Sequence, residues 1–224
     1  MKKVVKKVFK YTSTAEAAKH GDLDELYEMT KAKKKDGSPR FEKHNFTVVN
    51  AAAGGHEDCL KFAIDQKFHY NWVAAYSAAK NGHLKCLQIL HRSGVNWDCR
   101  TCEYAAYGGH LECLKFAHEN GCDWDDKTIE SAARNGHLEC LKYAVENDCE
   151  FTGEAFYAAI VNGRKECFEY LLRKKTNVSE VKLKKIMSKT IDGDHPAITN
   201  YLLKNRLMEE KERLLFLVKD CLLL

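Results

Sequence analysis

The segment SAARNGHLECLKYA occupies residues 131–144, and close copies of it recur along the chain. Its glycine has counterparts at a constant step of twenty-seven positions. The five glycines in phase are Gly55, Gly82, Gly109, Gly136 and Gly163. A fixed period of roughly 20–50 residues indicates a stack of repeated supersecondary units, each of which buries its apolar face against its neighbours.

Other positions of the segment repeat with the same step. An Ala-Ala pair precedes the glycine in four copies, and a leucine follows the cysteine in four copies, with Phe168 in the fifth. The residue after the glycine is His56, His83, His110, His137 and, in the fifth copy, Arg164. The cysteines, here called the repeat cysteines, are Cys59, Cys86, Cys113, Cys140 and Cys167. So many residue types in phase indicate common packing rather than chance.

Weaker copies extend the array at both ends. AEAAKHGDLDELYEM places Gly21 farther before Gly55 than one step, and the excess of seven positions fits a loop insertion around residues 31–40. HPAITNYLL, residues 195–203, keeps the apolar spacing without the Gly-His pair. We therefore expect seven repeats, with end repeats that diverge because they face water. The expected segments are a basic N-terminal segment at 1–11, repeats at 12–45, 46–72, 73–99, 100–126, 127–153, 154–180 and 181–206, and a C-terminal helix at 207–224.

Each repeat is predicted to form two short helices. In residues 127–134, Ile129, Ala132 and Ala133 give one narrow apolar edge at helical spacing. Asn135-Gly136 suits a left-handed helix stop. The second helix, from Leu138 on, has a broader apolar face, and its charged residues should point outward. Plausible surface pairs there are Glu139 with Lys142 and Lys142 with Glu146.

The motif A-A-x-x-G-H-L-E-C-L followed by a second helix resembles the ankyrin repeat over about residues 12–206. The resemblance implies an all-α, ankyrin-type helical-hairpin solenoid with a capping helix at its C-terminus. Two features depart from the family. Its usual period is about 33 residues, longer than the step of twenty-seven in this chain, and its T-P-L-H box is absent. The missing residues fall in the connecting hairpin, which should be short. This Cys-bearing variant looks like arrays of large DNA viruses and single-celled eukaryotes.

Charge is unevenly distributed along the chain. The net charge is +4, but residues 98–154 hold 13 acidic and 5 basic residues, a balance of −8. The remainder therefore carries +12, much of it in residues 1–10, 31–35 and 173–189. Two interpretations stay open: solvated ends and loops, or a basic tail that seeks nucleic acid or an acidic lipid surface.

Three features bear on location. No stretch reaches the roughly 18 apolar residues that a membrane-spanning helix needs. The N-terminal MKKVVKKVFK lacks the apolar run of a secretory signal. Ten cysteines without an export signal favour a reducing compartment. We expect an intracellular protein, in the cytoplasm above all, or in the host cytoplasm if the source is viral.

His-x-x-Cys is the motif that would suggest chemistry. Seen once, it is compatible with a thiolate–imidazole pair, but four copies indicate packing, because a catalytic site is normally assembled once. The cysteines then act as small buried hydrophobes. Cys99 and Cys102 have C-x-x-C spacing, yet zinc requires a second pair of ligands, and none stands nearby in the sequence. We expect no enzyme, metal or cofactor.

The columns that vary between repeats are the candidate binding positions. In ankyrin arrays the first helices and connecting loops line the concave face, where partners usually lie. Tyr107 and Arg134 are the leading anchors, since Tyr and Arg are favoured at binding hot spots. The candidate residues are Lys80, Asn81, Asp98, Arg100, Tyr107, Asp125, Asp126, Lys127, Arg134 and Glu154. The acidic surroundings favour a protein partner with a basic surface and disfavour specific nucleic-acid binding.

The C-terminal segment 206–224 has a different composition: nine of the eleven residues from Leu214 on are apolar. It caps the last repeat, docks a partner or mediates self-association. The sequence supports three candidate functions. The first is a non-catalytic, monomeric interaction scaffold. The second is a substrate-recruiting adaptor of a ubiquitin ligase that acts through the C-terminal helix. The third is a cysteine- or zinc-dependent enzyme, which the repetition disfavours.

Overall fold

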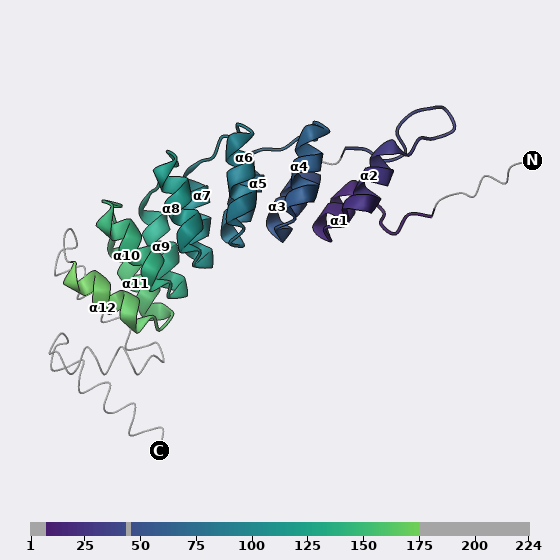
Figure 1. The fold of residues 1–224 in the computed structure, drawn as a ribbon. Coiled ribbons are helices and arrows are strands. Elements are labelled where there is room, and N and C mark those ends of the chain that lie inside the picture. Colours follow the sequence, from purple (N-terminus) through teal and green to yellow (C-terminus); the bar gives the residue numbers. More distant parts are fainter. Residues whose placement is uncertain (1–7, 44–45, 175–224) are drawn as a thin grey trace, which may run out of the picture. The chain divides into compact units, whose positions relative to one another are not determined.

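The computed structural model describes residues 8–43 and 46–174, and this part of the chain is all-α (Figure 1). Its helices are α1 Thr14–Lys19, α2 Leu23–Lys31, α3 Phe46–Gly54, α4 Glu57–Asp65, α5 Trp72–Lys80, α6 Leu84–Arg92, α7 Cys99–Gly108, α8 Leu111–Glu119, α9 Asp126–Asn135, α10 Leu138–Glu146, α11 Gly153–Val161 and α12 Lys165–Arg173. Within these residues the β-structure is one isolated bridge between Lys33 and Pro39. The expected repeat at 181–206 and the C-terminal helix at 207–224 lie outside the described residues.

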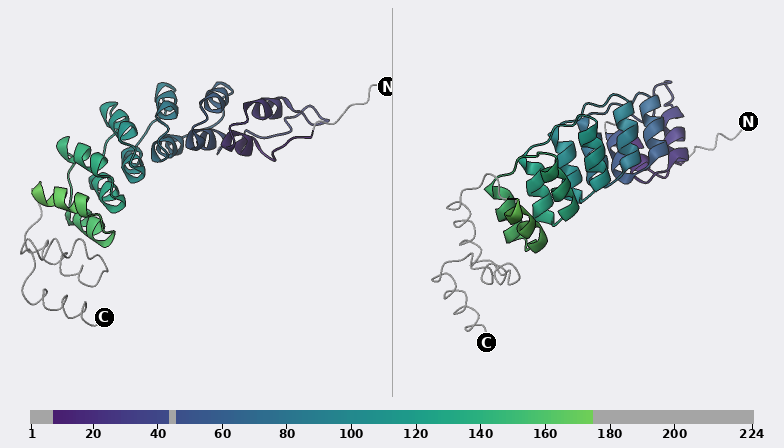
Figure 2. Two further views of the ribbon diagram at one scale, coloured as in Figure 1. Left: turned by 60° about the horizontal axis from the view of Figure 1, so that its bottom comes forward. Right: turned by 60° about the vertical axis from the view of Figure 1, so that its left-hand side comes forward.

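The chain divides into two compact units, Met1–Thr101 and Cys102–Leu224, here called unit 1 and unit 2. In unit 1, α1 packs on α3 and α3 on α5, while α2, α4 and α6 form a second layer. In unit 2, α9 packs on α11, and α10 lies between α8 and α12. Figure 2 shows this succession of helix pairs from two further sides. Each unit thus has a layer of first helices and a layer of second helices, as the hairpin prediction requires.

Local capping defines the helices of each hairpin. At the start of α9, the Asp125 carboxylate accepts the Lys127 amide proton, with an N···O distance of 3.1 Å. At its end, Gly136 adopts the left-handed conformation with φ 82° and ψ 22°, which confirms the predicted stop. Of the two predicted pairs, Glu139–Lys142 forms with an N···O distance of 2.8 Å, whereas Glu146 instead accepts the Tyr170 hydroxyl at 3.0 Å. The turn residues therefore close the hairpin where the sequence indicates.

The core consists of the columns that repeat. The repeat cysteines are at most 2% exposed and are free thiols, as predicted. The alanine pairs are fully buried, and so are the leucine after each of the first four repeat cysteines and Phe168 after the fifth. Cys102 is also fully buried, in the core column expected for it. Fully burying a leucine stabilises a fold by about 1.5–3 kcal/mol, so the stacked leucines supply a large share of the driving force.

Candidate protein-binding surface

The first helices expose several large apolar side chains to solvent. Four of the six large apolar residues exposed within the described residues lie on α3, α7 and α11: Phe46, Tyr107, Tyr157 and Val161. We call the exposed side of the first helices of a unit its first-helix face. Exposed Tyr and Phe side chains supply contact area for a partner at low cost in conformational entropy.

Both predicted anchors belong to first helices, Tyr107 to α7 and Arg134 to α9. Tyr107 is 41% exposed near the end of α7, and its ring centroid lies 6.1 Å from that of Tyr104. Arg134 is the equivalent residue on α9, and its guanidinium pairs with Glu130 one turn earlier. This pairing holds the arginine in place while 48% of its side chain stays exposed.

Two further exposed residues of the first helices lie outside the candidate list: sequence reasoning missed Tyr157, and it named Val161 only as a member of the variable column of Tyr107 and Arg134. Tyr157 and Val161 are 41% and 45% exposed, one turn apart on α11. They stand one repeat step after Glu130 and Arg134, in the same two columns.

The loop candidates have local roles at helix starts. In unit 1, the Asp98 carboxylate accepts the Arg100 amide proton at 3.1 Å and pairs with the Arg100 guanidinium at 2.5 Å. The hydrogen bond between the Asp98 carboxylate and the Arg100 guanidinium raises the pKa of Arg100. The same guanidinium lies 3.4 Å from the centroid of the Trp72 ring. Asp98 and Asp125 therefore stabilise helices in addition to any contact with a partner.

The remaining candidates divide between capping and solvent-facing positions. The Asn81 carboxamide donates to the Ser77 carbonyl at 2.8 Å, near the end of α5. Asp126, half-buried, lies in the first turn of α9. The exposed candidates at helix ends are Lys80, Lys127 and Glu154.

The repeated histidine connects each hairpin to the preceding one. In unit 1, the His56 ring lies against Gly21, and its Nε2 lies 3.0 Å from the Lys19 carbonyl oxygen. His83 lies against Gly55 in the same way. A Cβ on either glycine would approach the ring closer than 3.0 Å. The glycine column is therefore required by both its left-handed backbone and the contact with the histidine.

Unit 2 repeats this contact and explains the one departure from histidine. His137 lies against Gly109, and Arg164 lies against Gly136. The Arg164 Nε donates to the Arg134 carbonyl at 3.2 Å, the counterpart of the His56 contact with Lys19. Arginine thus replaces histidine because it reaches the same carbonyl of the preceding repeat.

Comparison with known proteins agrees with this architecture. A family model described as "Ankyrin repeats (3 copies)" matches residues 103–182, and one described as "Ankyrin repeats (many copies)" matches residues 48–91 and 73–118. The matches together run from residue 48 to residue 182, more than half of the 224-residue chain. The chain belongs to the ankyrin repeat family.

A solved structure supports the fold of this ankyrin repeat protein. The crystal structure of the human ASB11 ankyrin repeat domain has a TM-score of 0.58 and 17% sequence identity, over 75% of this chain and 85% of that one. At this identity the likeness bears on the fold alone. A search of curated proteins found no match. Ankyrin repeats generally mediate protein–protein interactions, and ankyrin repeat proteins are typically non-catalytic scaffolds.

The repeat cysteines of this ankyrin repeat protein are in an environment that opposes nucleophilic chemistry. Burial raises the pKa of Cys59, Cys86, Cys113 and Cys167 to about 11, and that of Cys140 to about 12. A catalytic thiol requires the opposite shift, since the thiolate is the nucleophile. The four-fold His-x-x-Cys pattern is thus explained by the core position of the thiol and the contact of the histidine with the preceding repeat.

Within residues 8–43 and 46–174, neither a candidate metal site nor a membrane-spanning helix is found. Neither range contains a group of three or more His, Cys, Asp and Glu side chains arranged to hold a metal ion. No helix among those described is long and apolar enough to cross a membrane.

Proposed function

We propose that this ankyrin repeat array is a non-catalytic scaffold that holds a protein partner on the first-helix face of unit 2, with Tyr107 and Arg134 as anchors. The observation that supports it is the exposure of an aromatic ring and a guanidinium at equivalent positions of α7 and α9. Tyr and Arg are enriched among residues that dominate binding energy. The surface continues on α11 through Tyr157 and Val161.

The charge of the surroundings favours a basic partner. Asp125, Asp126 and Glu154 lie at or next to the starts of α9 and α11, and Glu130 lies on the first-helix face itself. Such a field attracts Lys and Arg side chains and repels phosphates, so it favours a basic protein over nucleic acid. We infer that the array acts as a monomer in a reducing, intracellular compartment.

The test begins with proximity labelling in the native cell, followed by measurement of affinity for the most enriched partner. The double substitution Tyr107→Ala with Arg134→Ala should weaken binding by about 10-fold or more, because hot-spot truncations typically cost above 1 kcal/mol each. A matched control is Tyr27→Ala with Lys142→Ala. Tyr27 is 42% exposed on the second helix α2, and Lys142 belongs to an ion pair on α10.

Two outcomes decide between this proposal and the alternatives. Unchanged affinity of the folded Tyr107/Arg134 double variant would show that the first-helix face of unit 2 is not the binding surface. A chain truncated after residue 206 should retain the partner. Loss of binding in that truncation would favour the ubiquitin-ligase adaptor that acts through the C-terminal segment.

A further inference from the structure

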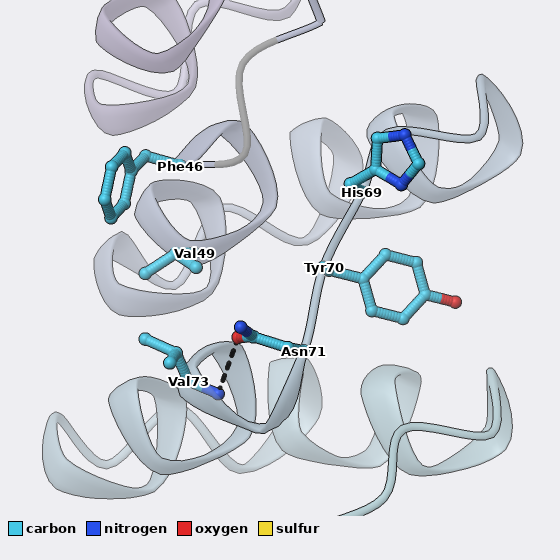
Figure 3. Close-up of a pocket in the computed structure, with 6 residues that line it drawn as sticks. All are labelled: Phe46, Val49, His69, Tyr70, Asn71 and Val73. Atoms are coloured by element: carbon cyan, nitrogen blue, oxygen red, sulfur yellow. Dashed lines mark hydrogen bonds between the residues drawn. The ribbon is translucent and has the colours of Figure 1, made fainter.

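Unit 1 contains a pocket and a basic loop, neither of which the proposed function uses. The pocket has a volume of about 310 Å³ and lies where α3 and α5 begin (Figure 3). Its lining residues are Phe46, Val49, His69, Tyr70, Asn71 and Val73. None of them is Lys, Arg, Asp or Glu, so the lining offers no such charge by which a class of partner could be recognised. The charged feature of this unit is the loop after α2.

The loop after α2 forms a short hairpin at residues 32–40, here called the basic finger. Figure 1 shows this loop extending beyond α2. Lys33 and Pro39 form an antiparallel bridge, and the Lys34 amide donates to the Ser38 carbonyl at 2.8 Å. The basic finger is therefore a two-stranded ribbon rather than an open loop.

Hydrogen bonds close the tip of the basic finger. The Gly37 amide donates to the Lys34 carbonyl at 3.0 Å, and Gly37 has a left-handed φ of 83°, which suits the turn of a short hairpin loop. The Asp36 carboxylate accepts the hydroxyl and the amide protons of Ser38, at 2.6 and 2.9 Å. These two hydrogen bonds lower the pKa of Asp36. The one carboxylate of the finger is thus engaged within the tip.

The base of the basic finger is held by an arginine between two aromatic rings. The Arg40 amide donates to the Ala32 carbonyl at 2.8 Å. The Arg40 guanidinium lies 5.1 Å from the centroid of the Phe9 ring and 5.4 Å from that of the Phe41 ring, and the two centroids are 4.9 Å apart. Such cation–π contacts fix the position of the guanidinium without neutralising its charge.

The basic finger carries a local excess of positive charge. It contains four basic residues and one acidic residue, a net charge of +3. Lys33, Lys34 and Lys35 are exposed, and within the described residues their side chains have no hydrogen bond or ion pair. The acidic residues of α2 end at Glu28, three residues before the helix does. Three consecutive ammonium groups are therefore available to an anionic partner.

The composition of the basic finger distinguishes between anionic partners. Its sequence, AKKKDGSPR, contains no aromatic residue and no leucine, isoleucine, valine or methionine. Lysine is depleted in protein–protein interfaces, whose binding energy comes mainly from aromatic residues and arginine. Stable attachment to a bilayer takes an apolar anchor besides a polybasic patch, and the finger has no such side chain. The phosphates of a nucleic acid require cations alone.

Duplex DNA fits both the charge and the shape of this hairpin. It carries one negative charge per about 1.7 Å of its axis, and its major groove, about 12 Å wide, admits a two-stranded ribbon. We propose that the basic finger of unit 1 binds the phosphate backbone of double-stranded DNA, without reading its bases, through Lys33, Lys34 and Lys35. The contact is non-specific, in keeping with the expectation that the chain has no specific nucleic-acid partner. The site lies in unit 1 and is independent of the proposed function, which concerns unit 2.

The probe is a fluorescein-labelled, mixed-sequence DNA duplex of about two helical turns, titrated with the full-length protein. Fluorescence anisotropy should give a Kd of about 10⁻⁶–10⁻⁴ M at physiological salt, as for other non-specific complexes. The logarithm of the association constant should fall against the logarithm of the salt concentration with a slope of about −3 or steeper, since each neutralised phosphate contributes about −0.9.

Substitutions at the basic finger should change both quantities. Replacing Lys33, Lys34 and Lys35 together by glutamine should weaken binding by about 10-fold or more and make the slope shallower by about 2–3. Asp36→Asn removes the one carboxylate and keeps an oxygen for the Ser38 amide. It should therefore tighten binding by about 2–5-fold, the effect of one surface charge.

The matched control makes the same change in net charge elsewhere in unit 1. Lys61, Lys67 and Lys85 are exposed lysines outside the basic finger, and their joint replacement by glutamine should leave affinity and slope unchanged. The Tyr107→Ala with Arg134→Ala variant should also bind DNA normally, so failure of the proposed function leaves this result intact. Circular dichroism of each variant checks that the helical fold is retained.

The same titration with vesicles of phosphatidylcholine, with and without phosphatidylserine, tests a bilayer as the partner. Three outcomes overturn the proposal. The first is a triple finger variant that binds DNA with unchanged affinity and slope. The second is a control variant that loses as much affinity as the finger variant, because net charge would then suffice. The third is a higher affinity for the phosphatidylserine vesicles than for DNA.

Discussion

Two glycines of unit 2 separate the cost of backbone conformation from the cost of losing the contact between repeats. Gly109 and Gly121 have φ of 75° and 80°, both in the left-handed region. A Cβ at Gly109 would lie closer than 3.0 Å to the His137 ring, whereas a Cβ at Gly121 would meet nothing within 4 Å. Alanine at either position therefore adopts the same left-handed backbone, and the two substitutions differ in the contact of the new Cβ with the His137 ring.

The magnitudes follow from these surroundings. Gly121→Ala should destabilise the protein by about 1–2 kcal/mol, the cost of a left-handed conformation for a residue with a Cβ. Gly109→Ala carries the same cost and must also displace His137, and forced repacking adds about 1–3 kcal/mol. With a urea m-value of about 2 kcal/mol/M, the two variants should differ in midpoint by about 0.5–1.5 M.

The assay is urea unfolding followed by far-UV circular dichroism, with His137→Ala as a second background. Without the imidazole ring, Gly109→Ala should cost no more than Gly121→Ala, so the coupling energy between Gly109 and His137 should exceed about 1 kcal/mol. Equal effects of the two glycine substitutions in the wild-type background would refute the contact as a source of stability.

Further predictions concern the core. Leu141→Ala should cost about 2–5 kcal/mol in a denaturant melt, as for other buried leucines; a near-neutral result would contradict its full burial. Thr128→Val should stabilise the protein by about 1–2 kcal/mol, because the buried Thr128 hydroxyl has no hydrogen-bond partner within the described residues; destabilisation would show that the hydroxyl is satisfied. The pKa of the repeat cysteines is raised from 9.0 to about 11 or 12, so their contribution to stability is complete below pH 9.0 and is lost as pH rises through that range. Urea midpoints that stay constant from pH 8 to about pH 11 would contradict this prediction.

The sequence predicted those parts of the fold that depend on periodicity. The constant step between the glycines located the hairpins, the repeat cysteines and the helix stop at Gly136. It did not reveal why histidine repeats, because the imidazole ring packs against the glycine of the preceding repeat, which only the stacking of the hairpins brings near. Arg164 was the available signal for a hydrogen bond at this position. Arginine and histidine differ in shape, but both carry an N–H group that can donate to a carbonyl oxygen.

The N-caps were missed although they follow the same step. Asn71, Asp98, Asp125 and Thr152 are each one repeat step apart, and each accepts a main-chain amide proton at the start of a first helix. Sequence reasoning treated Asp98 and Asp125 only as variable loop residues. Their shared ability to accept an amide proton was the missed signal. The pocket in unit 1 was beyond sequence reasoning, because it depends on how the segment 69–71 lies against α3.

The short connections decide which side chains are left for recognition. In unit 2, the side chain of Asp125 is engaged by the start of α9, and Cys149 is buried with its thiol donating to the Asp125 carbonyl at 3.3 Å. Loop residues tied into the hairpin in this way contribute charge but little adaptable contact. The first-helix residues Tyr107, Arg134 and Val161 instead keep 41%, 48% and 45% of their surface exposed. Substitutions at these exposed positions should therefore leave the packing of the stack intact, while under the proposed function they change the affinity for the partner.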